Sequence, residues 1–286
     1  MSISQSGSFA QHAFAADSVC AEVKIEIAQE LTLERQAFDA HMRINNGLSN
    51  ITLEDVDIDV SFSDETGNVV HASFDPNDTA ALFFIKIDSM DNITNVNGSG
   101  KVDPATSADI HWLIIPAPGA SNGVPQGTLY YVGATLKYTI GGEEHTTEVT
   151  PDYIFVKPMP ELVLDYFLPS EVFGDDAFTD EIEPPIPYTL GVRIGNNGLG
   201  TAKQVKINSA QPKITENKQG LLIGFAIDGC EVNDVLTKNT LLADFGNIAP
   251  NKASVARWIM HCTISGKFVD FKADFSHSDE LGGEQI

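Results

Sequence analysis

The sequence has few basic residues and no long apolar run, and each shortage excludes a class of protein. Its 286 residues include 17 Lys and Arg against 40 Asp and Glu, which gives a formal net charge of -23 at pH 7. A chain of this charge repels phosphate backbones and anionic headgroups at long range, so we expect no nucleic-acid partner. No window approaches the roughly 18 apolar residues of a membrane-spanning helix, so we also expect no direct membrane insertion.

Motifs of catalysis and of metal binding are also missing. The Gly-x-Ser-x-Gly turn of many hydrolases does not occur, and neither does a glycine-rich phosphate loop or a Cys-x-x-Cys pair. The seven histidines are never three or four residues apart, so zinc has no local ligand set. Two carboxylates for glycoside hydrolysis could still lie far apart in the chain. We predict a protein that is not an enzyme and has no certain cofactor.

What the sequence does contain is an internal duplication. Three landmarks recur in the same order: a glycine, an aliphatic residue, a proline and a tryptophan at fixed spacing, an Arg-Ile run that ends in an Asn-Gly-Leu turn, and an aromatic residue before valine. In the first copy they are Gly100, Val102, Pro104 and Trp112, then Arg43-Ile44 with Asn46-Gly47-Leu48, and Tyr131-Val132. In the second copy they are Gly246, Ile248, Pro250 and Trp258, then Arg193-Ile194 with Asn197-Gly198-Leu199, and Phe268-Val269.

Short segments in both copies alternate apolar and polar residues. Val23, Ile25 and Ile27, for example, alternate with charged residues, which is the period of a strand with one face in a core and one in water. Turns rich in Gly, Asn, Asp and Pro separate these segments, and no helical period persists for three turns. The pattern predicts an all-β chain of two tandem immunoglobulin-like antiparallel β-sandwiches related by internal duplication, with Trp112 and Trp258 in the two cores.

The run Lys157-Pro158-Met159-Pro160 separates the copies, because prolines cannot donate to a strand ladder and favour a stiff extended link. We predict a flexible leader over residues 1–19, a first sandwich over 20–157 and a second over 158–286. The first copy turns through Gly141-Gly142 into a returning strand, but no such strand follows in the second copy. The second sandwich is therefore expected to lack its last strand, either because the chain is truncated or because a neighbouring molecule donates the strand.

The run from Arg193 to Val205 reads Arg-Ile-Gly-Asn-Asn-Gly-Leu-Gly-Thr-Ala-Lys-Gln-Val. It resembles the strand, Asn-Gly turn and strand of the bacterial cell-adhesion-related (CARDB-like) immunoglobulin-like repeats. The match covers mainly the second copy, since the first lacks the second glycine and the alanine. Such repeats occur in tandem inside very large secreted or surface proteins. The resemblance implies a spacer or adhesive module and brings no catalytic residues.

The first 19 residues have neither the basic start nor the apolar centre of a signal peptide. Because modules of the implied type work outside cells, we expect an interior piece of a longer exported protein that is extracellular or on the cell surface. Its partners would be other domains of the same long chain, or a protein or glycan of the cell surface.

The second copy has an acidic insertion over residues 169–187 that the first copy lacks. Its carboxylates, with Asp165 just before it, are Asp175, Asp176, Asp180, Glu181 and Glu183. Calcium favours about six to eight oxygen ligands, which loops at domain junctions can supply. In the sequence the insertion lies next to the link, so we expect it to bind calcium and stiffen the tandem. The spacing is not that of an EF-hand, and the alternative is an acidic loop that is merely solvated.

The chain has only three cysteines, too few for a disulfide scaffold. Cys230 and Cys262 belong to the same copy and could form a disulfide across one sandwich. Two buried free thiols are the alternative, and Cys20 has no partner in either case.

Two functions remain open at this point. One is a non-catalytic pair of immunoglobulin-like modules that acts as a spacer or adhesion segment of a larger extracellular protein. The other is a carbohydrate-binding accessory module of a secreted glycan-active enzyme, in which surface aromatics such as Tyr130 or Tyr153 form a stacking platform.

Overall fold

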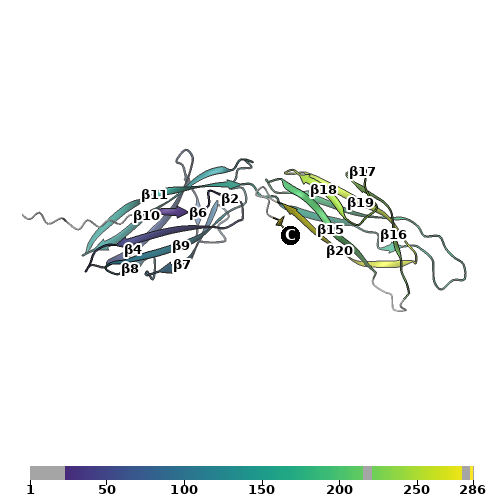
Figure 1. Ribbon diagram of the computed structural model, residues 1–286, viewed down its shortest axis with the longest axis horizontal. Helices are drawn as coiled ribbons and strands as arrows, with labels where there is room; N and C mark the ends of the chain where they lie inside the picture. Colours follow the sequence, from purple (N-terminus) through teal and green to yellow (C-terminus); the bar gives the residue numbers. More distant parts are fainter. Residues whose placement is uncertain (1–22, 215–220, 279–283, 286) are drawn as a thin grey trace, which may run out of the picture.

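All regular secondary structure of the described residues is β-strand. A computed structural model describes residues 23–214, 221–278 and 284–285, and Figure 1 shows its strands in two groups that lie end to end. We call strands β1 to β11 the first sandwich and β12 to β21 the second sandwich. No helix able to span a membrane is found among these residues. The predicted fold class, all-β with tandem antiparallel sandwiches, is confirmed.

The first sandwich consists of two facing sheets. One has the strand order β1-β3-β9-β7-β6 and the other β2-β11-β10-β4-β5, with β8 also paired to β4. Pairing is antiparallel except between β2 and β11 and between β6 and β7. The strands are β1 (Ile25–Ile27), β2 (Leu31–Leu33), β3 (Phe38–Asn46), β4 (Leu53–Asp64), β5 (Val69–Val70), β6 (Ala72–Ser73), β7 (Phe83–Asp91), β8 (Asn97–Val102), β9 (Thr106–Pro116), β10 (Thr128–Ile140) and β11 (Glu143–Lys157).

The second sandwich repeats this plan. Its sheets have the orders β12-β14-β19-β16-β17 and β13-β20-β15-β18, with β21 also paired to β20. The strands are β12 (Leu162–Phe167), β13 (Glu171–Val172), β14 (Tyr188–Asn196), β15 (Ala202–Ile214), β16 (Phe225–Val232), β17 (Val235–Leu236), β18 (Ala243–Ile248), β19 (Ala253–Cys262), β20 (Gly266–Ser278) and β21 (Glu284–Gln285).

The strand registers of the two sandwiches correspond. Ala40 is opposite Trp112 in the first sandwich, and Leu190 is opposite Trp258 in the second. Both indoles are buried, with 1% and 0% of their surface exposed, inside separate apolar cores between the sheets. The tryptophan landmark therefore marks equivalent positions, and the internal duplication extends to the structure.

The Asn-Gly landmark is shifted by one residue from the expected match. Asn46 and Asn196 are the equivalent residues, because each is buried, accepts a bond from the backbone N-H two residues later, and donates to the carbonyl that ends β8 or β18. Leu48 therefore corresponds to Gly198. The structure thus aligns Asn46 with Asn196, and not with Asn197.

The match of Tyr131-Val132 with Phe268-Val269, expected from the sequence, is also wrong, because the structure does not align these residues. Ile58 pairs with Leu136, and its counterpart Ile207 pairs with Phe275. Tyr131 lies five residues before Leu136, whereas Phe268 lies seven residues before Phe275. The two aromatics therefore occupy different positions along their strands.

One edge differs between the sandwiches. β11 pairs with β10 from Thr128 to Ile140. The matching edge of β20 pairs with β13 at Gly266 and Lys267 and with β21 at His277 and Ser278. Within the described ranges no other strand pairs along this edge of β20. That the second sandwich lacks a last strand, which a longer chain or a neighbouring molecule would provide, stays a prediction.

Candidate functional site

The segment between β11 and β12 is bound by side chains and backbone of the first sandwich. Arg35 follows β2 and donates from Nη2 to the carbonyl oxygen of Pro160 over 2.8 Å. The backbone N-H of Glu34 donates to the carbonyl oxygen of Lys157 over 3.0 Å. The link prolines, Pro158 and Pro160, are buried. The link is therefore packed against protein and not an exposed tether.

The carboxylate of Glu34 is the centre of this contact and is only 2% exposed. Its Oε1 accepts bonds from the N-H groups of Gly119 and Ser121 over 2.9 and 3.0 Å, and from the Ser121 hydroxyl over 2.6 Å. Its Oε2 accepts a longer bond, 3.4 Å, from the N-H of Met159. One buried side chain thus joins β2, the loop before β10 and the link.

The turn after β14 holds the link from the other side. Gly200 N-H donates to the carbonyl of Met159 over 3.1 Å, and the Asn196 side chain accepts from the N-H of Glu161 over 3.1 Å. A Cβ atom at Gly198 would lie 2.4 Å from the Glu161 nitrogen, and one at Gly200 would lie 2.6 Å from a link carbonyl. The glycines of the resembling motif therefore let the turn contact the link backbone.

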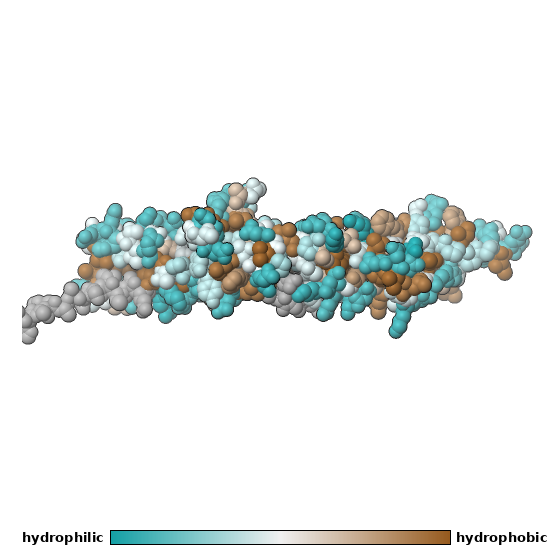
Figure 2. Space-filling model, turned by 90° about the horizontal axis from the view of Figure 1, so that it is seen from above, coloured by the Kyte–Doolittle hydropathy of each residue, from teal (hydrophilic) through white to brown (hydrophobic). Residues whose placement is uncertain are grey.

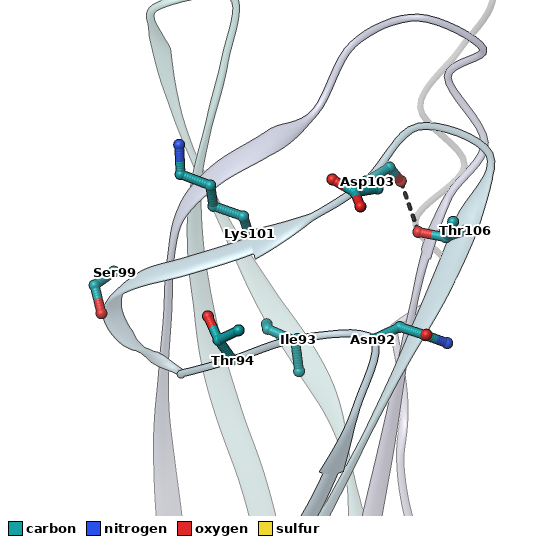
Figure 3. A pocket seen from close by; sticks show the side chains of 7 residues that line it. All are labelled: Asn92, Ile93, Thr94, Ser99, Lys101, Asp103 and Thr106. Atoms are coloured by element: carbon teal, nitrogen blue, oxygen red, sulfur yellow. Dashed lines mark hydrogen bonds between the residues drawn. The ribbon is translucent and has the colours of Figure 1, made fainter.

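A polar hollow of about 520 Å³ lies at the opposite end of the first sandwich, between the end of β7 and the start of β9 (Figure 3). Lys101 and Asp103 are its titratable lining residues. The Lys101 amine is bound to Glu54 over 2.7 Å, and Figure 3 shows it pointing away from Ile93. The Thr106 hydroxyl donates to the backbone carbonyl of Asp103 over 2.7 Å, the bond drawn in Figure 3.

Five titratable side chains meet on the outer face of β3 and β9, a cluster that the sequence spacing did not reveal. The rings of His41 and His111 stack with centroids 4.5 Å apart. His41 contacts Asp109 over 2.8 Å, His111 contacts Asp39 over 3.0 Å, and Arg43 also binds Asp109 over 2.8 Å. The bonds from Arg43 and His41 lower the pKa of Asp109. These carboxylates are already paired with nitrogen groups.

The two tyrosines named as a stacking platform have opposite orientations. Tyr130 is 2% exposed, and its hydroxyl donates to the carbonyl of Ala120 inside the first sandwich, so its proposed surface role is wrong. Tyr153 is 37% exposed on the outer face of β11. Its register partner on β10 is Tyr131, which is also 37% exposed. The exposed pair is therefore Tyr131 and Tyr153.

A second hollow, of about 570 Å³, lies beside this pair. It is formed by the β4–β5 turn, the loop before β10 and the apolar residues Leu129 and Phe155. Its side chains include the carboxylate of Asp64, which accepts bonds from the side chains and backbone of Asn68 and Thr66. These bonds lower the pKa of Asp64 to about 2, so this carboxylate is ionised at neutral pH.

The acidic insertion lies away from the link, contrary to the expectation from sequence. The link enters β12 at Leu162, which pairs with Asn196, whereas the insertion leaves after Phe167, which pairs with Gly191. These ends of the six-residue strand are five residues apart, about 17 Å at 3.3 Å per residue. A site in the insertion therefore cannot stiffen the tandem by contacting the link.

Three of the predicted calcium ligands, Asp175, Asp176 and Glu183, take part in bonds inside the loop. Asp165 binds Arg193 over 2.8 Å on the sheet. Asp175 accepts from the N-H of Glu183 over 2.9 Å, and Asp176 donates its N-H to the Glu183 carboxylate over 3.0 Å. Over the described ranges, no three His, Cys, Asp or Glu side chains are grouped to hold a metal ion. Calcium binding by the set that also includes Asp180 and Glu181 stays a prediction.

Calcium is expected to raise the melting temperature of the second sandwich if these carboxylates move together around the ion. The gain in free energy would follow RT ln(1 + [L]/Kd). Differential scanning fluorimetry with calcium and with chelator measures it. The variant Asp180→Asn/Glu181→Gln, which removes two ligands, should lose the gain. Identical melting curves in calcium and chelator would eliminate the site.

The two cysteines of the second sandwich are both buried and free. Cys230 is opposite Trp258 on the neighbouring strand, and Cys262 is opposite Phe225. The two positions are four residues apart along β19, about 13 Å, whereas a disulfide needs Cα atoms within about 7 Å. The register therefore keeps Cys230 and Cys262 from forming the disulfide, and burial raises the pKa of the Cys262 thiol.

Comparison with known proteins identifies no family. No family model matches the sequence, and no curated protein gives a significant match. Among solved structures the chain is similar to the YadV chaperone, with 12% identity, 91% of this chain and 96% of that chain covered, and a TM-score of 0.22. It is also similar to the adhesin InvE of Yersinia pseudotuberculosis, with 9% identity, coverage of 92% and 57%, and a TM-score of 0.24.

A third similar structure is the type II cohesin dyad from the adaptor ScaA scaffoldin of Acetivibrio cellulolyticus, with 8% identity, coverage of 92% and 94%, and a TM-score of 0.20. TM-scores this low carry no argument about the fold or the function of this chain. The resemblance to cell-adhesion-related repeats stays a prediction.

Proposed function

We propose that the chain is a non-catalytic spacer and interaction module in which two sandwiches are held in a fixed end-to-end arrangement within an extracellular or cell-surface protein. The observation that carries this proposal is the link, since residues of both sandwiches bind its backbone. Glu34 and Arg35 hold it from the first sandwich, and the turn from Asn196 to Gly200 holds it from the second.

A flexible tether would leave its backbone groups to water, whereas this link is bound at Lys157, Met159, Pro160 and Glu161. Its two prolines further restrict φ. A fixed spacing is what a module that separates or presents other domains requires. The acidic charge, -23 over the chain, keeps such a surface soluble. Figure 2 shows hydrophilic residues interspersed with small hydrophobic groups along both sandwiches.

The substitution Gly198→Ala is expected to loosen the junction without unfolding either sandwich. A Cβ atom there would lie 2.4 Å from the Glu161 nitrogen and 2.5 Å from the Met159 oxygen, so the turn and the link must separate. Small-angle X-ray scattering should show one narrow end-to-end distance for the natural chain and a broader range for the variant.

The matched control is Gly47→Ala at the corresponding turn of the first sandwich, where an added Cβ meets no atom within 4 Å. This variant should scatter like the natural chain. A natural chain whose scattering requires two freely jointed sandwiches would refute the proposed fixed arrangement.

A second candidate function is the carbohydrate-binding accessory module. Tyr130 cannot stack on a sugar ring, because this residue is buried. The exposed pair of Tyr131 and Tyr153 supports it, and this pair leads to a more specific inference.

A further inference from the structure

The outer face of β10 and β11 carries a strip of four large apolar side chains. Tyr131 is opposite Tyr153, and Leu129 is opposite Phe155 two residues along the strands. Opposite residues of an antiparallel pair point to the same face, with Cβ atoms about 5 Å apart. We call Leu129, Tyr131, Tyr153 and Phe155 the aromatic strip. Its two rows are about 7 Å apart, the rise of two strand residues.

The strip is not part of the core. Tyr130 and Ile154, the inward neighbours on each strand, are 2% and 0% exposed, whereas Tyr131 and Tyr153 are each 37% exposed. The core is complete without these two rings. Tyr131 and Tyr153 are therefore large aromatic side chains that remain partly exposed to water.

Packing holds the Tyr153 ring in place. The Glu30 carboxylate near its hydroxyl raises the pKa of Tyr153. The ring also meets Phe155 edge to face, with centroids 6.2 Å apart. A ring held in this way loses little side-chain entropy when a ligand stacks on it.

The strip continues into the hollow of about 570 Å³, because Leu129 and Phe155 line both. Volumes of about 300–1,000 Å³ are usual for small-ligand sites. Gly127 has φ of +100°, which favours glycine, and a Cβ there would lie 3.2 Å from the Lys157 side chain and 3.4 Å from Phe155, so this residue lets the loop lie close against β11. The polar side chains of the hollow are Asp64, Glu65, Thr66, Asn122 and Thr128.

We propose that the aromatic strip and this hollow form a binding site for a neutral oligosaccharide, with Tyr131 and Tyr153 stacking on sugar rings and the polar side chains of the hollow bonding to sugar hydroxyls. The C-H faces of a pyranose are apolar and flat, and its hydroxyls donate to carboxylate and amide oxygens. Aromatic rings can stack on the C-H faces of such a ligand, and carboxylate, hydroxyl and amide groups can bond to its hydroxyls, so a site with both kinds of group matches it.

The charge of the hollow restricts which ligands can stack on the aromatic strip. No Lys, Arg or His lines the hollow, and Asp64 and Glu65 are acidic, so an anionic glycan would be repelled. A folded protein partner would cover about 800 Å² of this surface, more than four side chains provide. The two rows favour a ligand longer than one ring. This site adds to the proposed spacer function and does not depend on it.

A glycan array followed by isothermal titration calorimetry with neutral hexasaccharides, such as cellohexaose, xylohexaose and chitohexaose, tests the site on the whole chain. Binding of at least one of them is expected. Tyr131→Ala and Tyr153→Ala should each weaken that binding about tenfold, which corresponds to the value of one aromatic stacking contact. Tyr153→Phe keeps the ring and should lose much less.

The control is Tyr166→Ala, which removes a tyrosine that is 41% exposed on β12 of the second sandwich. It should bind like the natural chain, and near-ultraviolet circular dichroism should show all variants folded. Binding that survives both alanine substitutions on the strip, binding of cationic oligosaccharides alone, or no binding of any neutral glycan would each overturn the proposal. Scattering of the natural chain would still report separately on the fixed arrangement.

Discussion

Trp258→Ala is expected to unfold the second sandwich at a temperature roughly 10 °C or more below its natural transition, and to leave the first sandwich unchanged. Trp258 is fully buried, and its indole N-H donates to the carbonyl of Thr240 over 2.8 Å. Truncation of a buried tryptophan costs about 3–5 kcal/mol, a large share of the stability of a domain. Differential scanning calorimetry measures the two transitions.

Trp112→Ala supplies the matched experiment in the first sandwich. Trp112 occupies the equivalent position in a separate core, so its loss should shift the other transition. If each substitution moves one transition, the proposed boundary between residues 157 and 158 is supported. A single transition that both substitutions shift equally would contradict two independent folding units.

The fold could be predicted because its signals are local in sequence. Alternation of period two marks strands, and the repeated spacing around Trp112 and Trp258 marks the duplication. However, glycine is required at this repeated position for a different physical reason in each copy. A Cβ at Gly100 would collide with the Asn95 carbonyl, whereas Gly246 has φ of +65° and open space around it. A matched residue in a repeat therefore does not establish a matched contact.

The outward orientation of Tyr131 could have been predicted from the sequence. Val132, Leu136 and Tyr138 face the core, and Tyr130 has the same parity, so the alternation along β10 places Tyr130 inward and Tyr131 outward. That Tyr131 would be opposite Tyr153 could not be predicted, because the register depends on the bulge between Val132 and Ala134. One residue more or less in that bulge would change the pairing.

The junction could not be predicted from the sequence. Glu34 reaches Ser121 and Met159, which lie 87 and 125 residues further along the chain. No local pattern distinguishes this carboxylate from the solvated acidic residues. The acidic insertion is close to the link in the sequence but not in the structure, because β12 separates the two: the link lies at its first residue and the insertion follows its last.

Glu34→Ala is expected to destabilise the first sandwich and to loosen the junction. The substitution leaves the half-buried N-H of Gly119 and the buried N-H of Ser121 without their acceptor, and each unsatisfied buried donor costs about 1–3 kcal/mol, so the expected loss is about 3 kcal/mol. It also removes the acceptor of the Met159 N-H. Thermal unfolding measures the first effect, and scattering measures the second.

Glu34→Gln separates the two effects. The amide oxygen can still accept from Gly119 and Ser121, but its NH2 group would face the N-H of Met159, donor against donor. We expect a smaller loss of stability, about 1 kcal/mol, with a broadened distribution of end-to-end distances. The control is Glu54→Gln, since Glu54 forms an exposed ion pair with Lys101 and such pairs contribute about 0–1 kcal/mol. If Glu34→Gln scatters like Glu54→Gln, the carboxylate does not hold the link.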